Sequence, residues 1–291
     1  MRIFNLGSIN ADHVYRVPHL PAPGETLAAS SYARGLGGKG ANQSVAAARA
    51  GADLRHIGAV GPEGGWMVGR LSALGVDCRH VATVETVSGH AVINLDAKGE
   101  NAIVIVPGAN RAIPADLPEV ALKGAVPGDV LILQNETGLQ AETARFAQEQ
   151  GLFVVYSAAP FEADAVRAVL PYLSLLLLNE VEAGQLTSAL GVALSDLPVP
   201  AICVTRGAKG AVWYDLRAGT RTEAPIFAVE AVDTTGAGDT FAGYLVAGLA
   251  QGLAPAAALR LAAAAAALKV KRHGAAEAIP TLAETKAFLQ E

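Results

Sequence analysis

The sequence has little cysteine, few aromatic side chains and few charges. It contains only two cysteines, Cys78 and Cys203, in 291 residues, and aromatic and charged residues make up 5% and 17% of the chain. Two cysteines so far apart exclude a disulfide scaffold, and we expect both to be buried thiols in a reducing compartment. A formal net charge of -5 gives no basic surface for nucleic acid or for an anionic membrane.

Long uninterrupted apolar runs are absent as well. The longest apolar region, 241–270, is interrupted by Gln251, Pro255 and Arg260, so it predicts two buried helices and no membrane span. The first seven residues read as a strand, without the apolar segment of a secretory signal. We therefore expect a cytoplasmic protein. What the chain does have is 52% hydrophobic residues, enough to fill a sizeable core.

The pattern along the chain predicts two kinds of sheet. From about residue 129, short apolar strands alternate with helical spacing, which is typical of a parallel sheet covered on both faces. These strands are expected at 129–134, 152–157, 175–178 and 201–205, and the helices at 139–150 and 162–170. In the N-terminal third, strands without intervening helices are expected at 13–17, 27–32, 89–96 and 102–106, with a hairpin turn at 96–99. Helical spacing returns at 39–50 and 65–74, so the main body is interleaved with a small, partly exposed sheet.

One segment has the composition of a phosphate site. Asp233-Thr234-Thr235-Gly236-Ala237-Gly238-Asp239 directly precedes an apolar helical run, 241–249. Small residues at a helix start leave the first backbone N–H groups accessible, and the helix dipole favours an anion there. Asp239 would stand beside that anion and could accept a proton from a hydroxyl that attacks phosphorus. The alternative is that both aspartates only cap the helix.

A second segment, 35–43, reads Gly-Leu-Gly-Gly-Lys-Gly-Ala-Asn-Gln. It formally contains G-x-G-x-x-G, but it does not follow the first strand of a βαβ unit, so a dinucleotide fingerprint is not supported. A P-loop fails too, because Gly40 follows Lys39 where Ser or Thr is required. We expect a flexible loop that offers backbone N–H groups, an ammonium and the Asn42 amide to the hydroxyls of a small ligand. The alternative is a structural tight turn.

A third polar segment, 7–12, is expected to end the first strand. The two-residue period of a strand places Asn10 and Asp12 on the same side. Paired acceptors there suit sugar hydroxyls, and the alternative is a polar turn.

Together, segments 37–42 and 233–239 resemble the two signature regions of the ribokinase-like (PfkB) family of carbohydrate kinases. The segments Gly7 to Asp12 and Gly108-Ala109-Asn110 strengthen this resemblance. Lesser similarities are Asn179-Glu180-Val181-Glu182, and Thr205-Arg206-Gly207 with Gly210. The resemblance covers essentially the whole chain. It implies an α/β fold with a ribokinase-like three-layer α/β/α body, a central mostly parallel sheet and a small β-sheet lid. It further implies a single domain, 1–291, with lid strands at about 11–34 and 88–106 inserted in the body.

The resemblance also implies roles for individual residues. Asp239 would be the catalytic base, and an anion hole would be formed by the N–H groups of Gly236, Ala237 and Gly238. The sugar would be held by Asn10, Asp12, Gly38, Lys39, Asn42 and Glu136. The nucleotide side would be formed by Asn179, Thr205, Gly207 and Gly210, with Glu182 acting on Mg²⁺ through water. A monovalent cation such as K⁺ would lie near Asp233 and the carbonyls of Thr235, Lys269, Arg272 and Gly274. Ala278 departs from the hydroxyl that family members often present to this cation.

The implied activity is phosphoryl transfer from ATP to a primary hydroxyl of a small sugar, with D-ribose to D-ribose 5-phosphate as the first choice. Alternatives within the family are kinases for fructose, another pentose or a nucleoside. A nucleoside kinase would need an apolar or aromatic slot for the base, and only 5% of the residues are aromatic. Other classes are a non-catalytic sugar or nucleotide sensor on the same fold and a Rossmann-type dehydrogenase. The partners expected are the sugar, ATP and a second copy of the chain, in a homodimer formed through the lid.

Overall fold

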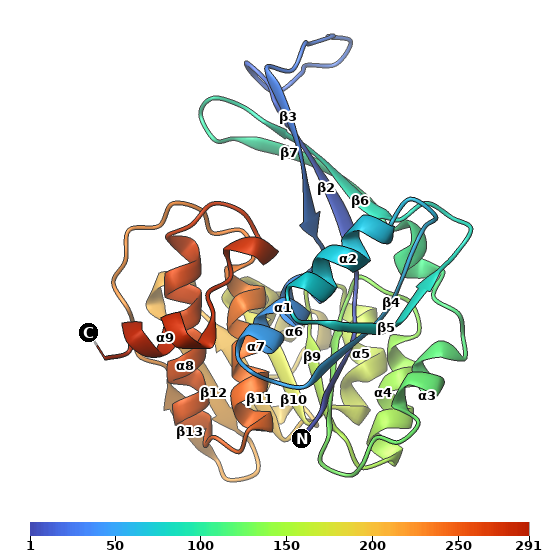
Figure 1. Ribbon diagram of the computed structural model, residues 1–291. Helices are drawn as coiled ribbons and strands as arrows, with labels where there is room; N and C mark the ends of the chain where they lie inside the picture. Colours follow the sequence, from blue (N-terminus) through green and yellow to red (C-terminus); the bar gives the residue numbers. More distant parts are fainter. Residues whose placement is uncertain (291) are drawn as a thin grey trace.

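A computed structural model describes residues 1–290 as a layered body from which a small sheet projects (Figure 1). The strands of the body are β1 (Ile3–Leu6), β4 (Leu54–Val60), β5 (Asp77–Thr83), β8 (Val130–Gln134), β9 (Phe153–Ser157), β10 (Leu175–Asn179), β11 (Ala201–Thr205), β12 (Ala211–Asp215) and β13 (Thr220–Glu223). They form one sheet in the order β13-β12-β11-β10-β9-β8-β1-β4-β5. The pairs from β11 to β5 are parallel, and the last two strands, β12 and β13, pair antiparallel. The mostly parallel body sheet is thus confirmed.

Helices cover both faces of this sheet. One face carries α1 (Lys39–Arg49), α2 (Gly65–Ala73), α7 (Ala237–Ala250) and α8 (Pro255–Val270). The other face carries α3 (Leu117–Leu122), α4 (Gln140–Glu149), α5 (Ala163–Val169) and α6 (Glu180–Leu190). The last helix, α9 (Leu282–Phe288), packs against α8. The result is the predicted three-layer arrangement. Within residues 1–290, no helix combines the length and apolarity needed to cross a bilayer.

The core follows from the two-residue period of the strands. In β8, Val130 and Ile132 belong to the apolar cluster under α1 and α7, whereas Leu131 and Leu133 belong to the cluster under α4. All four side chains are at most 2% exposed. A strand with an uninterrupted apolar run can bury both of its faces, and this explains why the four apolar residues 130–133 form a central strand.

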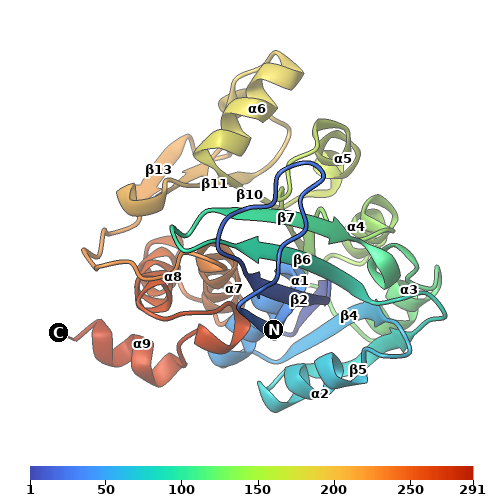
Figure 2. The same ribbon diagram turned by 90° about the horizontal axis from the view of Figure 1, so that it is seen from above.

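The small sheet consists of four strands in the order β3-β2-β6-β7. Their bounds are β2 (Asn10–Arg16), β3 (Ser31–Gly37), β6 (Gly89–Leu95) and β7 (Asn101–Val106). Asp96 closes the predicted hairpin between β6 and β7, because its Oδ1 accepts from the N–H groups of Lys98 at 2.8 Å and Glu100 at 2.9 Å. Figure 2, which looks down on the molecule from the side of the small sheet, shows β6 and β7 crossing above the body.

Three local predictions were wrong. The strand expected at 27–32 lies instead at 31–37, where it pairs with β2. The segment 35–43 is therefore no loop, because its first residues end β3 and α1 begins at Lys39. Asn10 and Asp12 lie in β2, not at the end of the first strand. The glycine-rich segment lacks the alternation of apolar and polar side chains that is typical of a strand. Its extended conformation is set by pairing with β2.

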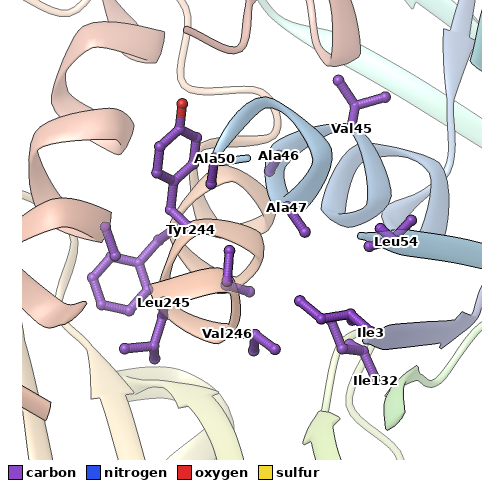
Figure 3. Packing of buried hydrophobic residues seen from close by; sticks show 14 of the residues in the cluster. Ile3, Val45, Ala46, Ala47, Ala50, Leu54, Ile132, Tyr244, Leu245 and Val246 are labelled. Carbon is purple, nitrogen blue, oxygen red and sulfur yellow. The ribbon is translucent and has the colours of Figure 1, made fainter. Parts of the chain in front are cut away.

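Close packing of α1 against α7 positions the site. Ala46, Ala47 and Ala50 of α1 face Tyr244 and its neighbours on α7 (Figure 3). A Cβ added to Gly243 would collide with Ala46 and with the α1 backbone, so the glycine permits the two helices to approach closely. Because the first turns of both helices then meet, side chains from the two sequence motifs come into contact.

Candidate active site

The candidate site lies where the strand order of the body reverses. From β1 the chain builds outward in one direction through β4 and in the other through β8, and ligands of open α/β sheets bind at such points. Polar residues stand at the carboxyl ends of the strands there: Ser8 after β1, Glu136 after β8, Asn179 ending β10 and Thr205 ending β11.

A cleft opens beside these strand ends. Its wall includes seven of the predicted site residues, namely Lys39, Asn179, Glu182, Thr205, Gly236, Gly238 and Asp239. Segments from four separate parts of the chain therefore meet at one cleft.

Asp239 lies in the first turn of α7 and is held by α1. Its Oδ2 accepts a hydrogen bond from Asn42 Nδ2 at 3.0 Å, and its Oδ1 accepts one from Gln43 Nε2 at 3.1 Å. Two amide donors fix the orientation of the carboxylate without neutralising its charge. The Asp239 carboxylate faces the cleft, where it could accept a proton from a bound hydroxyl.

The start of α7 has the features of an anion site. Gly236 precedes the helix in the left-handed conformation, with φ of 72°, and no side chain caps the helix. The alternative that the two aspartates serve as caps is therefore wrong. The N–H of Ala237 donates to Thr234 O at 3.1 Å, whereas those of Gly236 and Gly238 have no acceptor among residues 1–290. These two donors, at the positive end of the helix dipole, are available to an anion.

Lys39 brings a positive charge to the same cleft. Burial lowers the pKa of Lys39, but the carboxylates of Asp239, Glu136 and Glu182 outweigh that effect, and the pKa is raised overall. The side chain therefore remains an ammonium among three carboxylates. Its backbone N–H donates to Glu136 Oε2 at 3.0 Å, which ties the start of α1 to the end of β8.

A polar group lies on the side of the small sheet. Asn10 Oδ1 accepts from Asn110 Nδ2 at 2.7 Å, and the Ile9 N–H donates to Asn110 Oδ1 at 2.9 Å. The Ser8 hydroxyl donates to Glu136. Within this group the side chains of Asn10 and Glu136 are fixed by hydrogen bonds from neighbouring residues. Fixed side-chain oxygens can present acceptors to a ligand in a defined geometry.

Asp12 is the most perturbed carboxylate of this group. Burial first, and the negative charge of Glu136 second, raise the pKa of Asp12 to about 6. Gly37 on the neighbouring strand leaves the space that the carboxylate fills, because an added Cβ there would overlap it. Asp12 thus lies close enough to Glu136 for the negative charge of Glu136 to act on it.

Asn179 and Glu182 form a capping box at the start of α6. The Glu182 N–H donates to Asn179 Oδ1 at 2.8 Å, and the Asn179 N–H donates to Glu182 Oε2 at 2.8 Å. Burial raises the pKa of Glu182, the backbone hydrogen bond from Asn179 and the charge of Lys39 oppose this, and the charge of Asp239 adds to it. The capping box therefore holds a carboxylate on the cleft wall with one oxygen, Oε1, directed to no donor in the described chain.

Other predicted residues lie away from the cleft wall. Gly207 and Gly210 form the turn after β11, where the Arg206 N–H donates to Gly210 O at 2.7 Å. The Arg272 guanidinium pairs with Glu284 on α9 at 2.6 Å. The carboxylate of Asp233 accepts from the N–H groups of Thr235 and Gly274, at 2.8 and 2.9 Å.

Residue-by-residue reasoning missed Gln43 and the buried amides behind it. Gln134 Nε2 donates to both Gln43 Oε1 and Asn5 Oδ1, at 2.9 and 2.8 Å, and all three residues are 0% exposed. One signal was present: Lys39, Asn42 and Gln43 are spaced i, i+3 and i+4, which places them on one face of a helix. The helix expected at 39–50 carried that signal, but the contact of Gln43 with Asp239 depends on the packing of α1 against α7, which the sequence does not show.

Comparison with known proteins identifies the class of enzyme to which this fold and cleft belong. The model of the pfkB family carbohydrate kinases matches residues 2–282, and the chain belongs to that family. Ribokinase of Haemophilus influenzae is 37% identical over 303 residues, covering 98% of this chain and 97% of the relative.

Solved structures agree with this assignment. Ribokinase of Thermotoga maritima superimposes with a TM-score of 0.90 at 31% identity, covering 100% of both chains. Arabidopsis thaliana ribokinase complexed with ribose and ATP gives a TM-score of 0.89 at 29% identity, covering 100% of this chain and 99% of that one. The predicted ribokinase-like fold is confirmed, and the protein is a carbohydrate kinase.

Proposed function

We propose that the protein transfers the γ-phosphoryl group of ATP to a primary hydroxyl of a small sugar, with D-ribose as substrate and D-ribose 5-phosphate as product. The observation that carries this proposal is the position of Asp239, a carboxylate fixed by two amides at a helix start that offers free N–H groups. The ribose and ATP bound by the Arabidopsis relative support the choice of substrates.

The sugar would lie between the small sheet and α1. Asn10, Asp12 and Glu136 supply oxygen acceptors, whereas Lys39 and Asn42 supply donors. The backbone at Gly38 has φ of 94°, which a glycine adopts at low cost, and its Cβ position lies against Ser8 and Asn10. A site with both donors and acceptors in fixed places selects a polyhydroxylated ligand and rejects an apolar one, because a mismatch would leave buried groups unpaired.

In the chemical step the sugar oxygen forms a bond to the γ-phosphorus while the bond from that phosphorus to the β-γ bridging oxygen breaks. The hydroxyl proton passes to Asp239, and ADP leaves with the bridging oxygen. Negative charge on the transferred group is met by the N–H groups of Gly236 and Gly238. Lys39 lies close enough to Asp239, Glu136 and Glu182 for their charges to act on it, so its ammonium would balance carboxylates and phosphate.

The nucleotide would extend from α7 toward the ends of β10 and β11, along Asn179, Thr205 and the turn at Gly207 and Gly210. Magnesium bound to the phosphates would neutralise charge on them during transfer. Glu182 fits a water-mediated role, because its capped carboxylate faces the cleft with one oxygen unoccupied by a protein donor.

The small sheet would act as a lid that excludes water from the phosphoryl group. Its edge strand β7 exposes Ile103, Val104, Ile105 and Val106, which are 50%, 63%, 57% and 36% exposed. An apolar edge strand invites pairing with another chain unless it is covered. We propose that a second copy covers it in a homodimer.

The alternative functions differ in the residues that would contact the substrate that accepts the phosphoryl group. Kinases for fructose or another pentose would share the phosphoryl site and differ at Asn10, Asp12 and Glu136. A nucleoside kinase would need an apolar slot for a base. A non-catalytic sensor would bind sugar and ATP without turnover.

A coupled assay of ADP release over ribose, deoxyribose, fructose and nucleosides tests the proposal. The highest kcat/KM is expected for ribose, with the product phosphorylated on its primary hydroxyl in ³¹P NMR. A higher kcat/KM for a nucleoside or hexose would reassign the substrate. Binding of ribose and ATP without ADP release would indicate a sensor.

A further inference from the structure

Lys269 is a fully buried lysine outside the proposed sugar and phosphate sites. It lies in the last turn of α8, and its side chain is 0% exposed. A buried ammonium is costly unless oxygen acceptors replace the water it loses. Its Nζ donates to the main-chain carbonyl of Asp233 at 2.9 Å and lies 3.9 Å from Asp233 Oδ1. A positive charge of this chain therefore already occupies the space beside Asp233.

Asp233 is the residue near which the family resemblance implies an exchangeable monovalent cation. The resemblance assigns to that cation the carboxylate of Asp233 and the main-chain carbonyl of Lys269, and says nothing of an ammonium there. An alkali cation exchanges its hydration shell for several protein oxygens. The oxygens that the resemblance assigns to the cation must therefore be able to point toward it.

Four oxygens at this place are already engaged by the protein, whereas the carbonyls of Thr235, Arg272 and Gly274 accept from no donor within residues 1–290. Asp233 Oδ1 accepts from the Thr235 N–H, Oδ2 accepts from the Gly274 N–H, and the Asp233 carbonyl accepts from Lys269. The carbonyl of Lys269 accepts from the Arg272 N–H at 3.0 Å. Ala278 is buried and presents a methyl group in place of a hydroxyl. The Lys269 ammonium occupies the place beside Asp233 and would repel a second cation there, so the residues present do not fit an additional monovalent cation.

We propose that the ammonium of Lys269 is a tethered cation that replaces the exchangeable one, so that neither stability nor turnover depends on K⁺. The segment from Asp233 to Gly236 leads directly into α7, where Gly236, Gly238 and Asp239 are placed for phosphoryl transfer. Lys269 is thus a positioning residue that fixes this segment through Asp233 and touches no substrate. The proposal concerns a segment of the fold and does not depend on which sugar is phosphorylated.

The test compares KCl with choline chloride at equal ionic strength, with thermal unfolding as the first measurement and kinase turnover as the second. For the native protein, Tm and kcat should be the same in both salts, because no site remains whose occupancy would stabilise the folded state. Lys269→Ala removes the charge and opens space beside Asp233. Its Tm should fall by roughly 5 °C or more in choline, since the hydrogen bond and the charge that link α8 to Asp233 are lost, and KCl should restore most of the loss.

Two further variants separate charge from packing. Lys269→Met keeps the volume without the charge, so it should lose stability as the alanine variant does, and KCl should not restore it because the thioether fills the space. Lys271→Ala, at an exposed lysine in the next turn, should behave as the native protein in both salts.

Two results would overturn the proposal: a Tm or kcat of the native protein that rises in KCl but not in choline, or a Lys269→Ala variant as stable in choline as the native protein. Should the alanine variant fail to fold, the native protein and the methionine variant still decide. The Tm comparison needs no sugar, so a failure to phosphorylate ribose would count against the proposed substrate and leave this test intact.

Discussion

The side-chain amide of Gln43 donates to Asp239 Oδ1 at 3.1 Å, and this bond is the end of a buried chain of amides. Gln43 Oε1 accepts from Gln134 Nε2 at 2.9 Å, and Gln134 in turn donates to Asn5 Oδ1. The chain links α7, α1, β8 and β1, and its three amides are 0% exposed. The proposed catalytic base is therefore oriented by the centre of the body sheet as well as by its own helix.

Replacing Gln43 should thus impair chemistry more than sugar binding. Gln43→Met keeps the volume and removes both the donor to Asp239 and the acceptor for Gln134. Because small errors in the position of a catalytic group are costly, we expect kcat to fall about 10- to 100-fold with little change in the KM for sugar. Steady-state kinetics measures both, and Gln148→Met, at an exposed glutamine on α4, is the matched control. An unchanged kcat would show that Asn42 alone suffices to orient Asp239.

Asp239→Asn should abolish most of the turnover while the sugar still binds. The asparagine has the same shape but cannot take the hydroxyl proton, and loss of a general base costs roughly 10²- to 10⁴-fold in rate. Calorimetric titration with ribose should give a Kd near that of the native protein, which shows that the variant is folded. Near-normal turnover would remove Asp239 from its proposed role.

Gly37 and Gly35 offer a matched pair on one strand. A Cβ at Gly37 would overlap the Asp12 carboxylate, whereas nothing lies within 4 Å of a Cβ at Gly35. Gly37→Ala should displace Asp12 and raise the KM for sugar about tenfold or more, as overpacking by one methyl costs on the order of 1–3 kcal/mol. Gly35→Ala should leave the KM almost unchanged. Equal effects of the two substitutions would show that β3 flexibility, not the space for Asp12, governs binding.

The strands that could be predicted from the sequence are those whose own side-chain pattern determines their structure. The run 201–205 is apolar enough to be buried on both faces, and β11 has those bounds. By contrast, β3 is specified by its pairing with β2, and its own residues, Ser-Tyr-Ala-Arg-Gly-Leu-Gly, have no strand pattern. The strand was therefore misplaced, and the position of Asn10 and Asp12 on β2 was missed with it.

The candidate site was predictable as a set of motifs but not as a set of contacts. Resemblance named Asp239 and Asn42 without the hydrogen bond between them, which joins residues 197 positions apart. Gln134 was missed because its partners, Asn5 and Gln43, lie 129 and 91 positions away, and an apolar strand gives no sign of a polar partner across the sheet. Lys269 was assigned by its carbonyl, since helical periodicity does not show where a long side chain ends.

Asp12 should make stability depend on pH in an unusual direction. Burial and then the charge of Glu136 raise the pKa of Asp12 from its ordinary value of 3.8 to about 6. Between these values the native state holds a proton that the unfolded chain has lost, so the free energy of unfolding falls as pH rises from about 4 to about 6 and stays lower above that. Asp12→Asn removes this ionisation.

The asparagine variant should therefore be more stable than the native protein at pH 8, by up to about 2 kcal/mol, and should show little gain near pH 4. Urea unfolding at the two pH values measures the difference, with Asp116→Asn at an exposed aspartate as control. The same variant should bind sugar more weakly, because an acceptor is lost. A stability gain of equal size at both pH values would contradict the proposed ionisation.

The exposed edge of the small sheet makes the oligomeric state testable. Val104 is 63% exposed and pairs with Val92, which pairs with His13, so these three residues share the face of the sheet opposite Asp12. If a second copy covers this face, Val104→Lys places a charge in the interface and should shift the protein from dimer to monomer in light scattering at micromolar concentrations. Val126→Lys, at a valine 57% exposed on a loop of the body, should leave the mass unchanged. Because Val104 points away from Asp12, the monomer should still bind sugar. A native protein that is monomeric throughout, or a Val104→Lys variant that stays dimeric, would place the interface elsewhere or exclude it.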